Sequence, residues 1–520
     1  MVLVPNFMRY LLFFTSVFCL LAACGSTGQE PVPEGQSRLI FTEFVLQAHT
    51  QELGAAQTDL GVHAFSEEVV FTLQAEETGE ETVLLLDLNR IAQNPSLILP
   101  RGEYRFTLRS PEEALSPFLP VQGEGKIQLN TPELRFIPEL ESRHGLFTVA
   151  AQNVASPPRW LGAGEAVSFG RKADYFLLYA KEGQRGRMEV EETIRGGVLR
   201  RDLQAAAFRH AHFEILAPEA PGAAVQLAPA AFITETEEIR LPGSLPGSYS
   251  PEIVRDLEEE VRESSGLAFF GGSFWTVNDS GNENIVYQLD PETSLVQRRV
   301  RVENAPNIDW ESLAQDEQYL YIGDFGNNNG VRQDLVIQRV AQSDLLASTS
   351  VQATPIRFRY PDQTDFSFRP NAHDFDCEAF FYRDGMLHLF TKNWLTETTR
   401  YYRIPAEPGE HVAELVGEFE VNGLITGADV NVRTGDAVLI GYRLQGLSSQ
   451  VFVVLLRGYR EHVFDGEQHR MVLGSPATLG QTEAIQLLVD NRGKISSESF
   501  RAGIFQIPGR WIRFDFSDFL

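Results

Sequence analysis

Cysteine is scarce in this chain of 520 residues, which contains only Cys19, Cys24 and Cys377. Cys19 lies in an expected signal peptide and Cys24 is expected to carry lipid, so the mature fold would keep Cys377 alone. A single cysteine excludes an intramolecular disulfide and an all-thiolate zinc site, although it could join histidine ligands at a metal. We expect Cys377, between two acidic residues, to be a buried small hydrophobe rather than a reactive thiol.

Positive charge is also in short supply. The sequence has 44 Lys and Arg residues against 71 Asp and Glu residues, a formal net charge of -27, and no run rich in Lys and Arg. Nucleic acids and anionic membrane surfaces attract positive patches, so both are poor candidate partners. Cations, neutral polymers or basic partners fit better, and the plain alternative is that the charge serves solubility alone.

Motifs of several common enzyme classes are missing. The chain has no Gly-x-Ser-x-Gly elbow, no Walker phosphate-binding loop and no His-Glu-x-x-His pair. Serine-esterase, nucleotide-binding and zinc-protease chemistry of those types are therefore excluded.

The apolar run at the N-terminus, Leu11 to Leu21, is too short to span a membrane and predicts a secretory signal. It ends in Leu21-Ala22-Ala23-Cys24, which resembles the lipobox of bacterial lipoproteins. The resemblance implies a signal peptide over 1–23, acylation of Cys24 with palmitate or a similar chain, and a polar tether over 24–37. Gly25 after the cysteine favours the outer membrane, whereas the periplasmic or external face stays open. The alternative is a chance cysteine in an ordinary signal peptide.

The sequence has 42 Gly and 36 Phe residues, and apolar and polar residues alternate in short runs. These features indicate an all-β protein. Residues 38–150 predict a β-sandwich domain, 151–229 a second β-rich module, and 230–262 a linker or closing segment. His210 and His212 share one face of an expected strand, as a possible metal pair or as a solvated strand face. Residues 250–261 fit either a short helix or a strand that closes the next domain.

The C-terminal part, 263–520, contains a repeat. Five short segments align, each followed by further β-rich runs: Glu263–Leu267, Asp309–Leu313, Asp376–Phe380, Ile425–Asp429 and Gln481–Ile485. Repeats that contain about four strands each are typical of propeller blades. The sequence therefore predicts a five- or six-bladed β-propeller after the sandwich modules.

Propeller geometry brings the loops that enter each innermost strand to the same face as the loops joining the second and third strands. The candidate ligands expected there are Glu263, Asp279, Asp309, Glu311, Asp324, Asn327, Asp376, Glu378, Asp429 and Glu483. Clustered carboxylates repel one another unless a cation neutralises them, so we expect bound Ca²⁺, or ion pairs with Lys392, Arg332 or Arg443. A carboxyl pair sharing a proton is a third possibility, and acids that merely bond loop amides a fourth. The fourth repeat departs from the pattern, with Gly427 where its neighbours have Glu.

These motifs (ESSGL, NDSGN, DWESLA, IGDFGNN, FTKNW, LITGAD and QTEAI) resemble uncharacterised propeller lipoproteins and secreted proteins of diderm bacteria. More distantly they resemble the SdiA-regulated and esterase-like-phytase propellers. The resemblance implies a propeller fold, usually with six blades, but no established activity. Phytase-like relatives would imply Ca²⁺ and a basic phosphate clamp, and the acid-rich mouth expected here counts against phytate.

Two functions follow as expectations. The first is a binding or interaction platform in the cell envelope, whose propeller recognises a glycan, a protein, a small molecule or a cation-bridged ligand. The alternative is a Ca²⁺-assisted hydrolase of phosphoesters or other esters, with Glu311 or Glu378 as base and Lys392 as electrostatic stabiliser.

Overall fold

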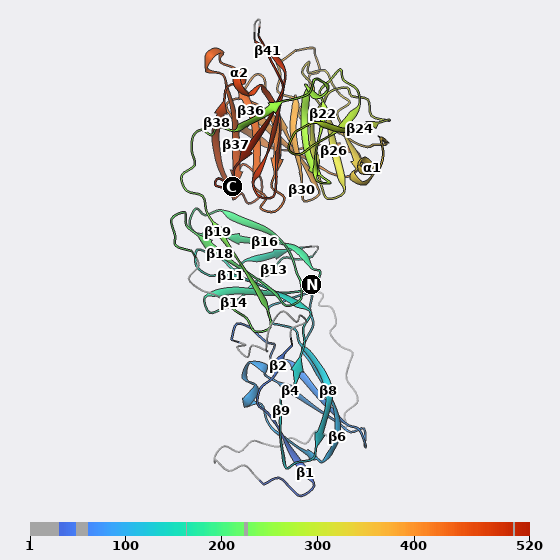
Figure 1. Ribbon diagram of the computed structural model, residues 1–520, viewed down its shortest axis with the longest axis vertical. Helices are drawn as coiled ribbons and strands as arrows, with labels where there is room; N and C mark the ends of the chain where they lie inside the picture. Colours follow the sequence, from blue (N-terminus) through green and yellow to red (C-terminus); the bar gives the residue numbers. More distant parts are fainter. Residues whose placement is uncertain (1–30, 48–60, 163, 223–226, 503–504) are drawn as a thin grey trace, which may run out of the picture.

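The computed structural model describes residues 31–47, 61–162, 164–222, 227–502 and 505–520 (Figure 1). The expected signal peptide, Cys24 and the first part of the tether lie outside these residues. In the described part, two β-sandwich modules and a propeller follow one another along the long axis of the molecule, with the propeller at one end (Figure 1). No helix among the described residues is long and apolar enough to cross a membrane.

The first module is a sandwich of two sheets, of which the smaller is mixed and the larger is antiparallel. One sheet has the order β5-β1-β9 and the other β4-β3-β6-β8. Side chains alternate between core and solvent along β6, where Tyr104, Phe106 and Leu108 are buried. The strands are β1 (Gln36–Phe41), β3 (Val69–Ala75), β4 (Glu81–Leu86), β5 (Leu97–Pro100), β6 (Gly102–Arg109), β8 (Gln122–Leu129) and β9 (Glu133–Phe136).

The second module is also a sandwich. Its larger sheet has the order β14-β15-β11-β18-β19 and its smaller sheet β13-β12-β16-β17. The strands are β11 (His144–Ala150), β12 (Arg159–Leu161), β13 (Val167–Ser168), β14 (Gly170–Lys172), β15 (Tyr175–Lys181), β16 (Arg185–Glu191), β17 (Val198–Gln204), β18 (Arg209–Leu216) and β19 (Ile233–Arg240).

Two strands of this module cross the domain boundaries expected from sequence. β11 was expected in the first module, yet it pairs with β15 and β18. β19 was expected in the linker, yet it pairs along its whole length with β18 in parallel. The Pro- and Gly-containing stretch before β19 is thus a connection inside the module, because a parallel neighbour needs a crossover rather than a tight turn.

The propeller consists of five sheets in the described residues, which we call blades 1 to 5 in chain order. The innermost strands contact one another in the order β21, β25, β30, β35 and β39, and β39 contacts β21, so the ring is closed. Blade 1 contains β21 (Ser264–Phe270), β22 (Ser273–Asn278), β23 (Ile285–Leu289) and β24 (Val296–Val302), and blade 2 contains β25 (Trp310–Gln315), β26 (Tyr319–Asp324), β27 (Val336–Ala341) and β29 (Thr354–Arg359). Blade 3 contains β30 (Cys377–Arg383), β31 (Met386–Thr391), β32 (Thr398–Pro405) and β34 (Glu414–Glu420), and blade 4 contains β35 (Leu424–Val430), β36 (Ala437–Arg443), β37 (Gln450–Arg457) and β38 (Glu467–Gly474). Blade 5 contains β39 (Gln481–Leu487), β40 (Arg492–Glu498), β43 (Arg510–Asp515) and β20 (Glu252–Asp256).

Blade 5 joins the two ends of the propeller sequence. β20, which precedes blade 1 in the chain, pairs antiparallel with β43 as the outermost strand of blade 5. Residues 250–261 therefore form the closing strand and a short 3-10 turn, Glu259–Val261, rather than a helix. Apolar side chains fill the space between neighbouring blades, as where Trp275 of blade 1 and Trp310 of blade 2 share one buried cluster.

Candidate metal centre at the acidic end of the propeller

Every innermost strand contains a β-bulge near its N-terminal end. The pairing with the second strand skips one residue in each blade, and the skipped residues are Ser265, Glu311, Glu378, Thr426 and Glu483. A bulge leaves one residue out of the ladder and re-aims its side chain. Three of the five bulge positions carry a glutamate, which places their carboxyl groups at one end of the ring of innermost strands. We call this the acidic end.

The bulges correct the alignment of the fourth repeat by one residue. Thr426, not Gly427, occupies the glutamate position, and its Oγ1 donates to the backbone oxygen of Thr482 in the next blade at 2.6 Å. Ser265 in blade 1 does the same toward Trp310 O at 2.9 Å. In blades 1 and 4 the hydroxyl of the bulge residue is therefore engaged in a hydrogen bond to the neighbouring blade.

The corrected register moves Asp429 away from the acidic end, contrary to the expectation. Asp429 pairs with Val438 at the other end of β35. Its Oδ2 accepts hydrogen bonds from Leu487 N and Gln486 Nε2, both at 2.6 Å. Burial raises the pKa of Asp429 to about 7, but its neighbours are backbone and amide groups that fit a structural role.

Asp279, Asp309 and Glu311 form the tightest carboxyl cluster. One oxygen from each lies within 4.8 Å of the others. Asp279 follows β22 in the loop to β23, Asp309 precedes β25, and Glu311 is the bulge residue of that strand. Asp279 and Asp309 are partly exposed and Glu311 is buried, so the cluster is reached from outside through the two aspartates.

Gly326 makes room for this cluster. A Cβ at this position would lie 2.3 Å from Glu311 Oε1 and 2.6 Å from Asp309 Oδ2. Any side chain there would have to displace the carboxyl groups. The second glycine of the IGDFGNN motif, Gly326, is therefore needed for steric reasons.

The electrostatics of the cluster are unbalanced. Glu311 is 5% exposed, and its Oε1 is buried without a hydrogen-bond partner among the described residues. Burial, together with the charges of Glu378 and Asp279, raises the pKa of Glu311 well above its ordinary value. Burial and the neighbouring Asp279 likewise raise the pKa of Asp309 to about 7. A buried carboxyl oxygen without a partner is costly, so this arrangement favours a bound cation.

Glu378 has a different environment, because it has its own cation. Lys392 Nζ lies 3.0 Å from Glu378 Oε1, and both side chains are almost fully buried. The ammonium also lies 4.9 Å from the ring centre of Trp394 and 5.6 Å from that of Tyr442. Glu378 and the other nearby carboxyl groups raise the pKa of Lys392 well above its ordinary value, although burial opposes this, so Lys392 is charged.

Glu483 and Glu498 of blade 5 complete the acidic end. Glu483 Oε1 accepts from Gln481 Nε2 at 2.6 Å, whereas its Oε2 is buried without a partner among the described residues. Burial raises the pKa of Glu483 to about 7, and burial with the nearby Glu483 raises that of Glu498 well above its ordinary value. The acidic end thus gathers the carboxyl groups of Asp279, Asp309, Glu311, Glu378, Glu483 and Glu498, with Asp376 beside them, near the buried ammonium of Lys392.

Three predicted ligands support the loops instead. Asp324 Oδ1 accepts from Asp309 N at 3.1 Å and pairs with Arg332 at 3.0 Å. Asp376 accepts from Asn327 N at 2.6 Å and from Trp394 Nε1 at 2.8 Å. Asn327 donates to Phe375 O at 2.9 Å, which ties the loops of blades 2 and 3 together. Asp324 thus holds the backbone of Asp309 in place, and Asp376 holds Trp394 with both of its own oxygens engaged.

Glu263 lies at the rim of the acidic end. Its Oε2 accepts from Asn282 Nδ2 at 2.6 Å, and Oε1 lies 3.3 Å from Arg262 Nε. Its backbone oxygen accepts from Asp279 N at 3.0 Å. Glu263 therefore positions Asp279 and is itself neutralised by Arg262.

The remaining candidates from the sequence add no ligand to the cluster of Asp279, Asp309 and Glu311. Cys377 is fully buried and free, as expected. His210 and His212 are buried rather than solvated, and both contact the Thr148 hydroxyl at 2.7 Å. Of the described residues, only Asp279, Asp309 and Glu311 group closely enough to hold a metal ion, so the histidine pair lacks a third ligand.

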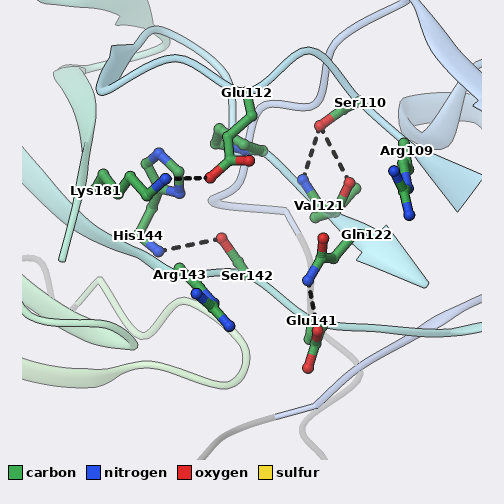
Figure 2. Close-up of a pocket in the computed structure, with 11 residues that line it drawn as sticks. Arg109, Ser110, Glu112, Val121, Gln122, Glu141, Ser142, Arg143, His144 and Lys181 are labelled. Atoms are coloured by element: carbon green, nitrogen blue, oxygen red, sulfur yellow. Dashed lines mark hydrogen bonds and ion pairs between the residues drawn. The ribbon is translucent and has the colours of Figure 1, made fainter. Parts of the chain in front are cut away.

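A separate pocket of about 290 Å³ lies between the first and second modules (Figure 2). Lys181 and Glu112 form an ion pair of 2.7 Å at its wall, and Gln122 donates to Glu141. None of the acidic-end residues lines it. Arg109, Arg143 and His144 also line it, and it contributes nothing to the propeller site.

Comparisons with known proteins add little. No protein-family model matches the chain, and no curated protein does. Solved structures with partial likeness include hydrazine synthase of Kuenenia stuttgartiensis, with TM-score 0.27 and 10% identity over 49% of this chain and 80% of that one. The WD40 propeller domain of Doa1 has TM-score 0.26 and 10% identity over 52% and 98% of the two chains. Domains 1–2 of Drosophila semaphorin 1b have TM-score 0.25 and 9% identity over 64% and 71%. The class of this protein, a β-sandwich and β-propeller protein with an acidic end, therefore rests on its own strand pairing.

Proposed function

We propose that the propeller binds a divalent cation, most simply Ca²⁺, at Asp279, Asp309 and Glu311, and serves as a binding platform in the cell envelope. The observation that carries the proposal is the buried, unpartnered Oε1 of Glu311 within a cluster whose oxygens lie within 4.8 Å. Hard cations take six to eight oxygen ligands, and three carboxylates with water can supply them.

The position of the acidic end supports a platform. The second module contacts the propeller at its opposite end: Arg187 pairs with Asp384 at 2.6 Å, and Val198 N donates to Gly458 O at 3.0 Å. Asp384 lies in the turn between β30 and β31, at the far end of those strands from Glu378. The sandwich modules thus leave the acidic end uncovered, and a cation there would face a partner directly.

Thermal unfolding with calcium and with chelator tests the cation site. A ligand that binds only the folded state at 100 times its Kd adds about 2.7 kcal/mol of stability, which raises the melting temperature by several degrees. We expect this rise in the wild type and its loss in Asp309→Asn. The matched control is Asp429→Asn, which removes a buried carboxyl group from the other end and should keep the rise. No calcium-dependent rise in the wild type would contradict the proposal.

We further propose that the mature protein is anchored in the outer membrane by lipid on Cys24, with the sandwich modules as a stalk. The lipobox-like residues before Cys24 support this. In diderm bacteria expressing the full chain, labelled palmitate should enter the wild type but not Cys24→Ala, and only the wild type should sediment with outer membranes. Labelling of Cys24→Ala would count against the anchor.

A hydrolase is the second candidate, favoured by the same free oxygen of Glu311. Glu378 is engaged by Lys392, which leaves Glu311 as the candidate base. Calcium-dependent cleavage of chromogenic phosphoesters that disappears in Glu311→Gln would support it. Equal cleavage by wild type and variant would exclude that role.

A further inference from the structure

The pocket between the first and second modules is positively charged in a protein that is otherwise strongly acidic. Three cationic side chains line it, those of Arg109, Arg143 and Lys181, together with the carboxyl groups of Glu112 and Glu141. These side chains carry one positive charge in excess, whereas the whole chain has a formal net charge of -27. A local excess of this kind attracts a small anion rather than a cation.

Strand pairing explains how the two arginines reach one pocket. Arg109 at the end of β6 lies opposite Gln122, and Gln122 lies opposite Glu141. Neighbouring strands are about 4.8 Å apart, so the backbones of Arg109 and Glu141 are roughly 10 Å apart. Arg143 follows two residues later, directly before β11, and Figure 2 shows Gln122 and Glu141 between the two arginines. The pocket therefore has one arginine from each module.

The carboxyl groups of the pocket have partners, whereas the two guanidinium groups do not. Glu112 has an ion pair of 2.7 Å with Lys181, and Glu141 accepts a hydrogen bond of 2.6 Å. Among the described residues, neither Arg109 nor Arg143 forms an ion pair or donates a hydrogen bond from its side chain. A guanidinium group presents five N–H donors in a planar fork, which matches the oxygens of carboxylates and phosphates.

A buried nitrogen of His144 also lacks a partner. Only 1% of this residue is exposed, and its Nε2 donates to the backbone oxygen of Glu113 at 2.8 Å. Because burial lowers the pKa of His144, the ring is neutral and its Nδ1 is an acceptor. Nδ1 is buried with no hydrogen-bond partner in the described part of the chain. Buried polar atoms nearly always have a partner, so a donor is missing here.

We propose that this pocket binds a phosphate group, whose oxygens accept from Arg109 and Arg143 and whose hydroxyl group donates to His144 Nδ1. Inorganic phosphate near neutral pH and a sugar phosphate both combine acceptor oxygens with a hydroxyl group. A tetrahedral phosphate offers oxygens to both walls of the pocket, whereas the two oxygens of a carboxylate lie in one plane. The bound group would join the two modules. This site is independent of the cation site in the propeller.

Isothermal titration calorimetry with inorganic phosphate tests the proposal on the full chain carrying Cys24→Ala, the parent protein. We expect one saturable site. Arg109→Gln and Arg143→Gln change exposed side chains and should each weaken binding about tenfold, because a charged hydrogen bond is lost. Glu141→Gln should tighten binding, because it removes a neighbouring negative charge.

The matched control is Arg135→Gln. Arg135 is an exposed arginine of β9 in the first module that does not line the pocket, so its replacement should leave the affinity for phosphate unchanged. No saturable heat with the parent protein would overturn the proposal. Equal weakening by Arg135→Gln and Arg143→Gln would also overturn it, because binding would then depend on overall charge.

Nuclear magnetic resonance of the histidine rings locates the bound phosphate. In protein labelled with ¹³C at histidine Cε1, phosphate should shift the resonance that is missing from His144→Gln. The same resonance should stay in place when phosphate is added to Arg143→Gln. A His144 resonance that does not move as the calorimetric site fills would contradict the proposal.

Lipid headgroups are a second source of phosphate groups, and sedimentation with vesicles of phosphatidic acid separates the two sources. Because the chain is strongly acidic, we expect the parent protein to bind free phosphate and to stay in the supernatant. Sedimentation that is lost in Arg143→Gln would assign the same pocket to a lipid headgroup. The phosphate site is supported in either case.

Discussion

At the scale of single residues, two glutamates at equivalent positions in their blades differ in the groups that contact their carboxyl oxygens. Glu311 and Glu378 are both bulge residues of innermost strands and both are buried. Glu378 is paired with Lys392, whereas Glu311 faces other carboxyl groups and keeps an oxygen without a partner. Their replacement by the nearly isosteric glutamine should therefore have opposite effects on stability.

For Glu311→Gln, we expect the free energy of unfolding without calcium to rise by about 1–2 kcal/mol at pH 8, because repulsion at a functional site is relieved. For Glu378→Gln, we expect a loss of about 3–5 kcal/mol, because a buried ammonium loses its partner. Urea unfolding in the presence of chelator measures both. Equal destabilisation by the two substitutions would mean that Glu311 is held by contacts of another kind.

At the scale of elements, the repeat in the sequence predicted where the innermost strands lie. It did not predict the register in which they pair with the second strands. The repeat located all five innermost strands, since ESSGL, DWESL, DCEAF, LITGAD and QTEAI lie on β21, β25, β30, β35 and β39. A bulge leaves no composition signal, so the fourth repeat was aligned as Ile425 to Asp429, one residue too late, and its final acid was counted among the ligands. The bulge at Thr426 instead leaves Asp429 at the other end of β35, opposite Val438.

Pairing across chain-distant elements was equally hidden from the sequence. β20 fitted either a helix or a strand, and only its pairing with β43 decides the matter. β11 and β19 were assigned to other domains because turn residues are as frequent inside a module as between modules. The clustering of the acidic residues was easier to predict than the groups that neutralise them. The loop positions indicated the cluster, whereas an ion pair with Lys392 was one of several alternatives for neutralising it.

The closing strand can be tested by cross-linking. Glu252 of β20 lies opposite Arg513 of β43, and their side chains form an ion pair of 3.2 Å on the surface. Facing residues of antiparallel strands have Cα atoms about 4.5–5.5 Å apart, within the range for a disulfide. Glu252→Cys with Arg513→Cys should oxidise readily and add roughly 2–4 kcal/mol to the free energy of unfolding.

The reduced form of the same double variant is the control. Failure of the two cysteines to couple under mild oxidant would mean that β20 does not close blade 5.

At the scale of the whole molecule, buried histidines tie stability to pH in the sandwich modules. His63 contacts the hydroxyl of Tyr179 at 3.2 Å and the backbone oxygen of Ala230 at 2.9 Å. Burial lowers the pKa of His63 to about 4 and that of His210 to about 3. Unfolding returns both groups to their ordinary pKa near 6.5, so the unfolded chain binds more protons below that pH.

The contribution of His63 to stability is therefore complete above pH 6.5 and is lost as the pH falls toward 4. The full loss is about 3 kcal/mol, at 1.36 kcal/mol for each pKa unit. Hydrogen exchange of β15 and β18 should accelerate between pH 7 and pH 5 more in the wild type than in His63→Gln, after correction for intrinsic exchange. Identical pH profiles of the two proteins would show that His63 is not held neutral by the fold.

The cation site at the acidic end is tested most directly by a crystal structure grown with calcium. The proposal predicts one strong peak bonded at about 2.3–2.6 Å to carboxylate oxygens of Asp279, Asp309 and Glu311. Lys392 should still be bonded to Glu378 in that structure. A map without a peak at these three residues at millimolar calcium, or with Glu311 Oε1 bonded to a protein group instead, would contradict it.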